Sequence, residues 1–187
     1  MNNTYKEFKQ PSYIVKDAGD WSRLIHEAFT NKKGFIFSDS RTGTETITAG
    51  LVKLGVKRES IIIINSATSK ENNVISFLAN PNHEVLKYDY VIYSPSMNVG
   101  SSITSVDYPT IGVISGIVSP FDVLQGLRRN RRIGIVDGVE KSISVYFQQT
   151  KYNIAMKSGK ITNDTCNTYK KRLKKLLESI KPAHYGV

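Results

Sequence analysis

The stretch "KKGFIFSDSRTGTETITAGLVKLGV" (residues 32–56) contains the pattern that decides the fold. Its apolar run at 35–37 is short and follows a glycine, as expected of a strand that is buried on both faces. A polar turn comes next, and apolar residues then recur at helical spacing, at Ile47, Leu51 and Leu54. Gly55 is expected to end this helix. The stretch therefore predicts a buried strand, a polar turn and a helix, in that order.

The same unit recurs on both sides of this stretch. Further strands are expected at "SYIVKD" (12–17), "SIIII" (60–64), "YDYVIY" (88–93), "TIGVISG" (110–116) and "SISVYFQ" (142–148). Helices are expected at "DWSRLIHEAFT" (20–30), "KENNVISFLANP" (70–81) and "FDVLQGLRRNRRI" (121–133). Apolar strands that alternate with helices indicate a parallel sheet covered on both faces, so the predicted fold class is α/β.

Composition limits the setting of the chain. Its 187 residues are 40% hydrophobic, which is enough for a core. No apolar run approaches the ~20 residues of a membrane span, and no secretory signal precedes the first helix. One cysteine, Cys166, and three histidines provide neither an internal disulfide nor a tetrahedral metal set. We therefore expect a cytoplasmic, intracellular protein with no membrane partner and no metal site.

Positive charge is concentrated at the carboxyl end. The formal net charge is +10, of which residues 151–187 carry +7 and residues 1–150 carry +3. Within "TYKKRLKKLLESIK" (168–181), apolar residues at helical spacing face away from a run of lysines. We expect an α/β domain at 1–150 and a basic helical extension at 151–187. That helix could dock on the body with its lysines in water, face nucleic acid or dock another chain.

Polar turns follow four of the predicted strands, at 38–44, 65–70, 94–102 and 115–120, and all are rich in Ser, Thr and Gly. Open parallel sheets bind ligands at the edge where their strands end. Small hydroxyl side chains and close backbone amides suit phosphate oxygens, and loops also use such residues for their own turns. The four turns together predict a phosphate-bearing ligand at this edge.

Four arginines follow the apolar residues of "FDVLQGLRRNRRI". If the whole segment is helical, Gln125, Arg129 and Arg132 share one face, while Val123, Leu124 and Leu127 point away from it. Guanidinium groups on a rigid element suit the charge of a transferring phosphate. The alternative is a basic helix that faces solvent or nucleic acid.

The order of these segments resembles that of a known family. "QGLRRNRR" (125–132) resembles motif VI of superfamily 2 helicases, in which Gln-x-x-Gly-Arg-x-x-Arg is typical, with Arg128 where glycine is usual. "YDYVIYSPSMNVGSSI" (88–103) resembles motif V, and "FIFSDS" (35–40) and "INSATS" (64–69) stand where motifs IV and IVa occur. The resemblance covers roughly residues 30–148 and is greatest to plasmid- and phage-type replication helicases and herpesvirus-type origin-binding helicases.

This resemblance implies a RecA-like carboxy-terminal motor domain, with a parallel sheet and helices on both faces. Arg129 and Arg132 would be arginine fingers on the γ-phosphate of ATP, and Gln125 would contact or relay that site. Gly100 and Ser102 would lie against the nucleotide, and many family members carry an acidic residue where this chain has Ser102. The residues implied to contact nucleic acid are Ser38, Ser40, Arg41, Ser66, Thr68, Ser94, Ser96 and Arg128.

Two helicase motifs do not occur in the sequence. It contains no G-x-x-x-x-G-K-[ST] loop and no Asp-Glu-x-His or Asp-Glu-x-Asp motif. ATP with Mg²⁺ would therefore be held mainly by an amino-terminal RecA-like domain in the same or another chain. We expect the carboxy-terminal half of a larger replication helicase, inactive alone, whose other partner is single-stranded or duplex DNA.

Two other interpretations stay open. The chain could be a non-catalytic nucleic-acid-binding or regulatory module that has the helicase-like fold, with its affinity in the basic tail. It could instead be an unrelated α/β enzyme acting on a phosphorylated metabolite. In that case the candidate carboxylates are Asp39, Asp89, Asp107 and Asp137, although their spacing assembles no nucleophile–base pair.

Overall fold

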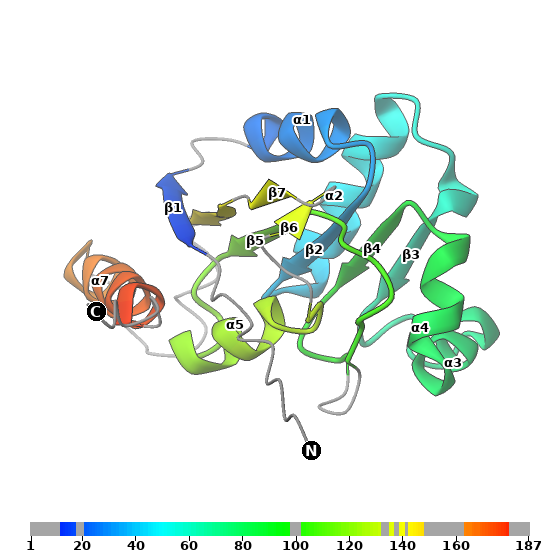
Figure 1. Ribbon diagram of the computed structural model, residues 1–187. Helices are drawn as coiled ribbons and strands as arrows, with labels where there is room; N and C mark the ends of the chain where they lie inside the picture. Colours follow the sequence, from blue (N-terminus) through cyan, green and yellow to red (C-terminus); the bar gives the residue numbers. More distant parts are fainter. Residues whose placement is uncertain are drawn as a thin grey trace, which may run out of the picture.

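A parallel β-sheet forms the centre of the computed structural model, which describes residues 12–17, 21–97, 102–131, 135–136, 139–140, 142–147 and 163–179 (Figure 1). Six strands pair in the order β1-β8-β5-β2-β4-β3, and all of their pairings are parallel. Their bounds are β1 (Tyr13–Asp17), β2 (Gly34–Ser38), β3 (Ile61–Ile64), β4 (Tyr90–Tyr93), β5 (Thr110–Ile114) and β8 (Ile143–Phe147). A separate antiparallel pair joins β6 (Ile135–Val136) to β7 (Val139–Glu140).

Helices cover both faces of the sheet (Figure 1). On one face lie α1 (Ser22–Thr30) and α2 (Arg41–Lys53). The other face is covered by α3 (Asn72–Ala79), α5 (Pro120–Leu127) and α7 (Asn163–Ser179). Short helical turns complete the connections, at η1 (Arg58–Ser60), α4 (Pro81–Glu84) and η2 (Val85–Lys87).

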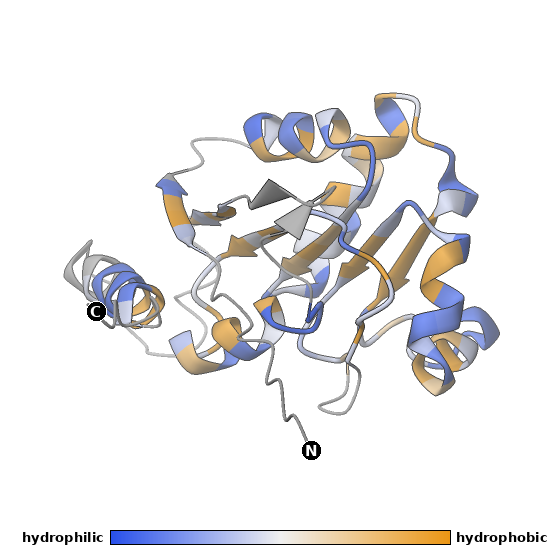
Figure 2. Ribbon diagram, in the orientation of Figure 1, coloured by the Kyte–Doolittle hydropathy of each residue, from blue (hydrophilic) through white to orange (hydrophobic). Residues whose placement is uncertain are grey.

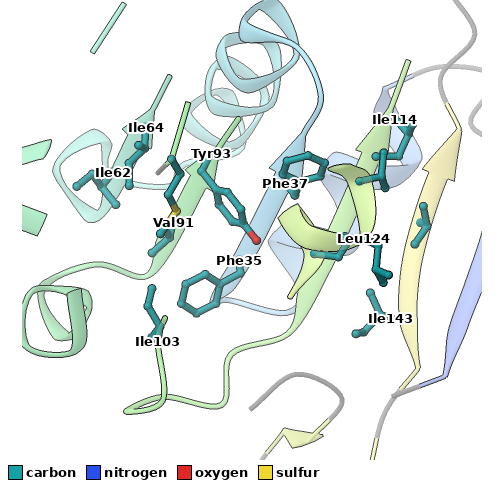
Figure 3. Close-up of a cluster of buried hydrophobic side chains, with 14 of the residues drawn as sticks. Phe35, Phe37, Ile62, Ile64, Val91, Tyr93, Ile103, Ile114, Leu124 and Ile143 are labelled. Carbon is teal, nitrogen blue, oxygen red and sulfur yellow. The ribbon is translucent and has the colours of Figure 1, made fainter. Parts of the chain in front are cut away.

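The inner strands β2, β4, β5 and β8 bury side chains on both faces, as their apolar runs predict, whereas Ile14 of the edge strand β1 is exposed. In β2, Phe35 and Phe37 join the cluster under α3, α5 and α7, whereas Ile36 joins the cluster under α1 and α2. Figure 2 shows the inner strands of the sheet as mainly hydrophobic, and Figure 3 shows the first cluster, in which Phe35, Phe37 and Tyr93 lie together. The predicted fold class, an α/β RecA-like sheet with helices on both faces, is confirmed.

Close contacts determine where α5 lies on the sheet. A side chain at Gly126 would overlap the ring of Phe37, so glycine lets the helix approach β2 closely. Leu127 packs over Gly112 of β5 in the same way, and the Tyr93 hydroxyl of β4 donates to the Gly126 carbonyl at 2.8 Å. The carboxyl end of α5 is therefore held against three neighbouring strands.

The basic extension shares the core of the domain. Leu173 and Leu177 of α7 are buried in the cluster that also contains Leu124 and Val123 of α5. The Tyr169 hydroxyl donates to the Val118 carbonyl at 2.6 Å. The apolar face of the tail helix thus docks on the body, as its amphipathic pattern predicts. The boundary at residue 150 stays a prediction, because residues 148–162 lie outside the described residues.

Leu173→Ala should destabilise the whole domain and not only the tail. Leu173 is fully buried, and deleting a buried leucine side chain costs about 2–5 kcal/mol. Urea unfolding followed by circular dichroism should show one transition at a lower midpoint. Lys174→Ala, on the exposed side of the same turn, should leave the midpoint nearly unchanged. Equal midpoints for both variants would show that α7 contributes nothing to the core.

Candidate functional site

The arginine-rich segment leaves the helix before its arginines. Helix α5 ends at Leu127, and Arg128 is its carboxyl cap with φ −94° and ψ 12°. Beyond it, the Ile103 amide donates to the Arg129 carbonyl at 3.0 Å, and the Arg131 amide donates to the Ile103 carbonyl at 2.7 Å. These bonds form a parallel bridge between Ile103 and Asn130. The prediction of one helix over 121–133 is therefore wrong.

Tertiary contacts explain why the helix stops. The Arg129 amide still donates to the Gly126 carbonyl at 3.4 Å, but the Arg129 carbonyl and the Arg131 amide bond to Ile103 and do not continue the helix. Asn130 is fully buried, and its side-chain amide donates to the Tyr108 carbonyl at 3.2 Å. The shared helical face predicted for Gln125, Arg129 and Arg132 is consequently wrong as well. Gln125 is exposed on α5, and Arg132 lies outside the described residues.

Residues 128–131, here called the arginine turn, lie at the edge of the sheet where the strands begin, the amino edge. Tyr108, which Asn130 contacts, comes just before β5, and the charge of Arg128 acts on Tyr13, the first residue of β1. Arg128 and Arg129 are half-buried, whereas Arg131 is exposed. Two arginines are therefore partly covered by the protein at this edge, and the third is exposed.

Buried phenols accompany the two half-buried arginines. Burial raises the pKa of Tyr93 well above its ordinary value, and the positive charge of Arg129 opposes this. For Tyr13 burial again raises the pKa, and the charge of Arg128 opposes it. Within the described residues, the buried Tyr13 hydroxyl has no hydrogen-bond partner. Both arginines thus have neutral phenols as neighbours.

The end of the segment that resembles motif V lies directly beside the arginine turn. Ser102 is half-buried, and its hydroxyl accepts from Arg131 Nε at 3.0 Å. The side-chain amide of Asn82 donates to the Ser102 carbonyl at 3.3 Å, and its oxygen accepts from the Thr104 amide at 2.8 Å. Sequence reasoning missed Asn82, because only the fold brings it to this loop. Gly100 lies outside the described residues.

The polar turns lie at the opposite edge, where the strands end, which we call the carboxyl edge. Several of their hydroxyls are engaged within the protein. Ser38 and Ser94 are buried, Ser40 accepts from the Gly43 amide at 2.9 Å as the cap of α2, and Thr68 donates to the Ile63 carbonyl at 2.7 Å. These four side chains shape the loops, and their contacts with nucleic acid stay predictions.

Other predicted residues at the carboxyl edge face the solvent. Ser66 and Ser96 are exposed, as is Arg41 in the first turn of α2. Arg41 forms an ion pair with Glu45, at 3.1 Å between Nε and Oε1. An exposed ion pair of this kind exchanges partners at little cost, so Arg41 can turn to a phosphate. These three residues form the accessible part of the predicted strand path.

Asp39 has a structural role at this edge that sequence reasoning missed. One of its oxygens accepts from the Ser115 amide at 2.9 Å, and the other accepts from Gly116 at 2.8 Å and Ile117 at 2.9 Å. Burial raises the pKa of Asp39, and the backbone amides that bond to it oppose this. The carboxylate thereby ties the end of β2 to the loop that begins α5.

The candidate carboxylates of a metabolite enzyme are divided between the two edges of the sheet. Asp39 follows β2 at the carboxyl edge, whereas Asp89 precedes β4 at the amino edge and pairs with Lys33 at 3.7 Å. Asp137 lies outside the described residues. Asp107 comes before β5 and so lies at the amino edge with Asp89, whereas Asp39, at the opposite edge, cannot act with either of them on one substrate atom.

Comparisons with known proteins add two structures of similar fold. No protein-family model matches the chain, and no curated protein matches its sequence. The C-terminal part of the Fun30 ATPase domain is 16% identical, with a TM-score of 0.42, over 84% of this chain and 52% of that one. The helicase domain of Hef from Pyrococcus furiosus is 15% identical, with a TM-score of 0.38, over 81% of this chain and 26% of that one. The chain thus spans about half or less of the length of each. Among the described residues, none of the helices has the length and apolar character needed to cross a bilayer.

Proposed function

We propose that this chain is the second motor domain of a superfamily 2 DNA helicase or translocase that acts in replication. In this proposal the arginine turn completes an ATP site, and the loops of the carboxyl edge guide a DNA strand. The observation that carries the proposal is the bridge between Ile103 and Asn130. It joins the segment that resembles motif V to the segment that resembles motif VI. The replication role and the plasmid, phage or herpesvirus-type subtype come from the sequence resemblance alone.

A rigid backbone supports the role of an arginine finger for Arg129. Its carbonyl accepts from Ile103, its amide donates to the Gly126 carbonyl at 3.4 Å, and the next residue, Asn130, is fully buried. A guanidinium stabilises a transferring phosphate best when it needs no reorganisation at the moment of reaction. The resemblance to motif VI implies two further contacts to this site, Arg132 as a second finger and Gln125. The role of Gly100 is implied by the resemblance to motif V.

The nucleotide itself needs a further domain. The sequence has no phosphate-binding lysine loop and no acidic magnesium motif, so ATP with Mg²⁺ would bind mainly to an amino-terminal RecA-like domain. That domain would approach the amino edge, where the half-buried Arg128 and Arg129 lie. Ser102 would lie at the side of the arginine turn when the nucleotide binds, because its hydroxyl is bonded to Arg131.

The DNA path is assigned to the carboxyl edge, away from the arginine turn. Exposed Arg41, Ser66 and Ser96 would contact backbone phosphates directly. The engaged hydroxyls of Ser38, Ser40, Thr68 and Ser94 would act by holding loop amides in place. Arg128, by contrast, lies at the amino edge, where its charge acts on Tyr13, so its predicted contact with nucleic acid would lie outside this path and stays a prediction.

Arg41→Ala should weaken binding of single-stranded DNA. If Arg41 neutralises one phosphate, its loss should reduce the salt dependence of binding by about 0.7 in the slope of log K against log salt. Fluorescence anisotropy with a labelled oligonucleotide at several salt concentrations measures this slope. Lys53→Ala, an exposed cation at the other end of α2, is the matched control and should leave the slope unchanged. An unaltered slope for Arg41→Ala would remove α2 from the path.

The complete gene product provides the test of the proposed function. We expect its reading frame to encode a phosphate-binding lysine loop upstream of residue 1. The purified product should hydrolyse ATP faster in the presence of single-stranded DNA and should displace a complementary strand. A complete product that binds DNA and does not hydrolyse ATP would contradict the proposal. It would instead support the non-catalytic nucleic-acid-binding or regulatory module, which the basic side of α7 favours.

A further inference from the structure

The exposed side of α7 carries positive charge that the proposed ATP site and DNA path leave unexplained. At 100° per residue, Tyr169, Leu173, Leu176 and Leu177 fall on one side of the helix, and all four pack on the core. The opposite side presents four exposed cations, here called the basic face: Lys171, Arg172, Lys174 and Lys175. Docking of the apolar side therefore fixes the direction in which these cations point.

Lys170 belongs to the body and not to the basic face. Its ammonium group lies 6.0 Å from the centroid of the Phe147 ring, and its side chain is half-buried. Among the described residues, none of the four cations of the basic face forms an ion pair with a carboxylate. Glu178 lies on the same side of the helix, four residues after Lys174 and three after Lys175, and is the one acidic residue within 168–179.

The arrangement of these charges opposes helix stability. Lys171 is three residues from Lys174 and four from Lys175, and like charges at these spacings destabilise a helix. A helix that only had to be soluble would mix charges of both signs on this side. The repulsion is relieved when a polyanion lies along the helix, because each neutralised phosphate also releases condensed counterions.

The place of α7 indicates which polyanion would reach it. Tyr169 bonds to Val118 in the loop that follows β5, so this helix adjoins the carboxyl edge, where the proposed strand path lies. The basic face spans roughly 160° around the helix, by 100° per residue. So broad a face can contact the phosphates of both backbones that flank a groove, which a single strand does not offer.

We propose that the basic face of α7 binds the phosphate backbones of duplex DNA beside the carboxyl edge. This contact adds a second DNA surface to the proposed function and does not depend on the ATP site. In a motor that separates strands, it would hold the duplex next to the path of the single strand. An acidic protein segment is the competing occupant, and the test below includes it.

The test compares two triple variants of the full chain that remove equal charge. Lys171→Gln, Lys174→Gln and Lys175→Gln alter the basic face, whereas Lys32→Gln, Lys53→Gln and Lys57→Gln remove three exposed cations near α1 and α2. Anisotropy with a labelled 20-base-pair duplex is measured at several salt concentrations. We expect the first variant to lose about ten-fold or more in duplex affinity and to reduce the salt slope by about 2.7, at 0.9 per phosphate. The control variant should change neither quantity by a comparable amount.

Further measurements keep the proposal falsifiable if the glutamine substitutions disturb the fold. Glu178→Gln removes the acidic residue from the basic side and should strengthen duplex binding, which a damaged helix would not do. Equal losses in both triple variants would mean that only net charge matters, and would overturn the proposal. The triple variant of the basic face is also tested for binding to polyglutamate. If it loses polyglutamate binding and keeps duplex binding, the basic face binds an acidic protein partner, and the proposal is overturned. If the complete gene product does not hydrolyse ATP, the duplex-binding results of these variants still test the proposal for the basic face.

Discussion

In the proposed helicase, replacing Arg129 by alanine should lower the ATPase rate of the complete enzyme by a factor of about 10³ or more, as expected for loss of an arginine finger. The substitution should remove the guanidinium and leave the backbone in place, because the backbone of Arg129 is held by hydrogen bonds to Ile103 and Gly126. Steady-state kinetics should show the loss in kcat, while DNA affinity measured by anisotropy stays near its original value. Thermal unfolding of the variant checks that the neighbouring Tyr93 remains packed.

Two further substitutions separate a finger from general positive charge. Arg131→Ala removes an exposed guanidinium from the same turn, together with its bond to Ser102, and should change kcat only slightly. Arg129→Lys keeps the charge and loses the planar, bidentate donor, so its rate should fall between those of the original enzyme and Arg129→Ala. If Arg129→Ala hydrolyses ATP at the original rate, the assignment of Arg129 to the nucleotide is wrong.

Local sequence patterns predicted the sheet well because its strands are buried on both faces. The runs at 35–37 and 61–64 could be recognised without knowledge of their partner strands, because a strand covered on both faces is typically apolar throughout. Helix α2 was predicted from the helical spacing of Ile47 and Leu51, and both side chains are fully buried. The starts of the polar turns were also placed correctly at the carboxyl edge, because parallel strands all end on one side, whereas Ser102, at the end of the turn 94–102, lies beside the arginine turn.

The end of α5 could not be predicted from local sequence. "LRRNRR" has adequate helix propensity, and what stops the helix is a bridge to Ile103, more than twenty residues earlier in the chain. Likewise, nothing local distinguishes the buried Ser38 from the exposed Ser66, since each follows an apolar strand. The outcome depends on which neighbouring loop supplies a hydrogen-bond partner, and that is a property of the fold.

Asp39→Ala should destabilise the domain by roughly 3 kcal/mol or more, because it leaves three backbone amides without their acceptor. Asp39→Asn is the more informative change. An asparagine has one oxygen, so it can keep either the Ser115 bond or the bonds to Gly116 and Ile117. The side-chain amino group of the asparagine then faces at least one backbone N–H, from which it cannot accept a hydrogen bond. We expect a loss of about 2 kcal/mol or more, measured by urea unfolding.

Hydrogen exchange shows whether this carboxylate also positions the arginine turn. The loop that Asp39 holds leads into α5 at Pro120, and the arginine turn follows the other end of that helix. In Asp39→Asn, faster exchange at the amides of 115–117 is expected in any case. If α5 moves with its loop, the Ile103 and Arg131 amides, which form the bridge, should exchange faster too, and kcat should fall in the complete enzyme.

Asp89→Asn is the matched control for Asp39, because Asp89 is half exposed and pairs with Lys33 across 3.7 Å. Its unfolding free energy should change by less than about 1 kcal/mol, with no effect on either set of amides. Suppose that Asp39→Asn accelerates exchange at 115–117 and leaves the bridge amides and kcat untouched. The contacts of Gly126 with Phe37 and Tyr93 would then hold the end of α5 independently of its start. Asp39 would in that case stabilise the carboxyl edge and have no influence on the nucleotide.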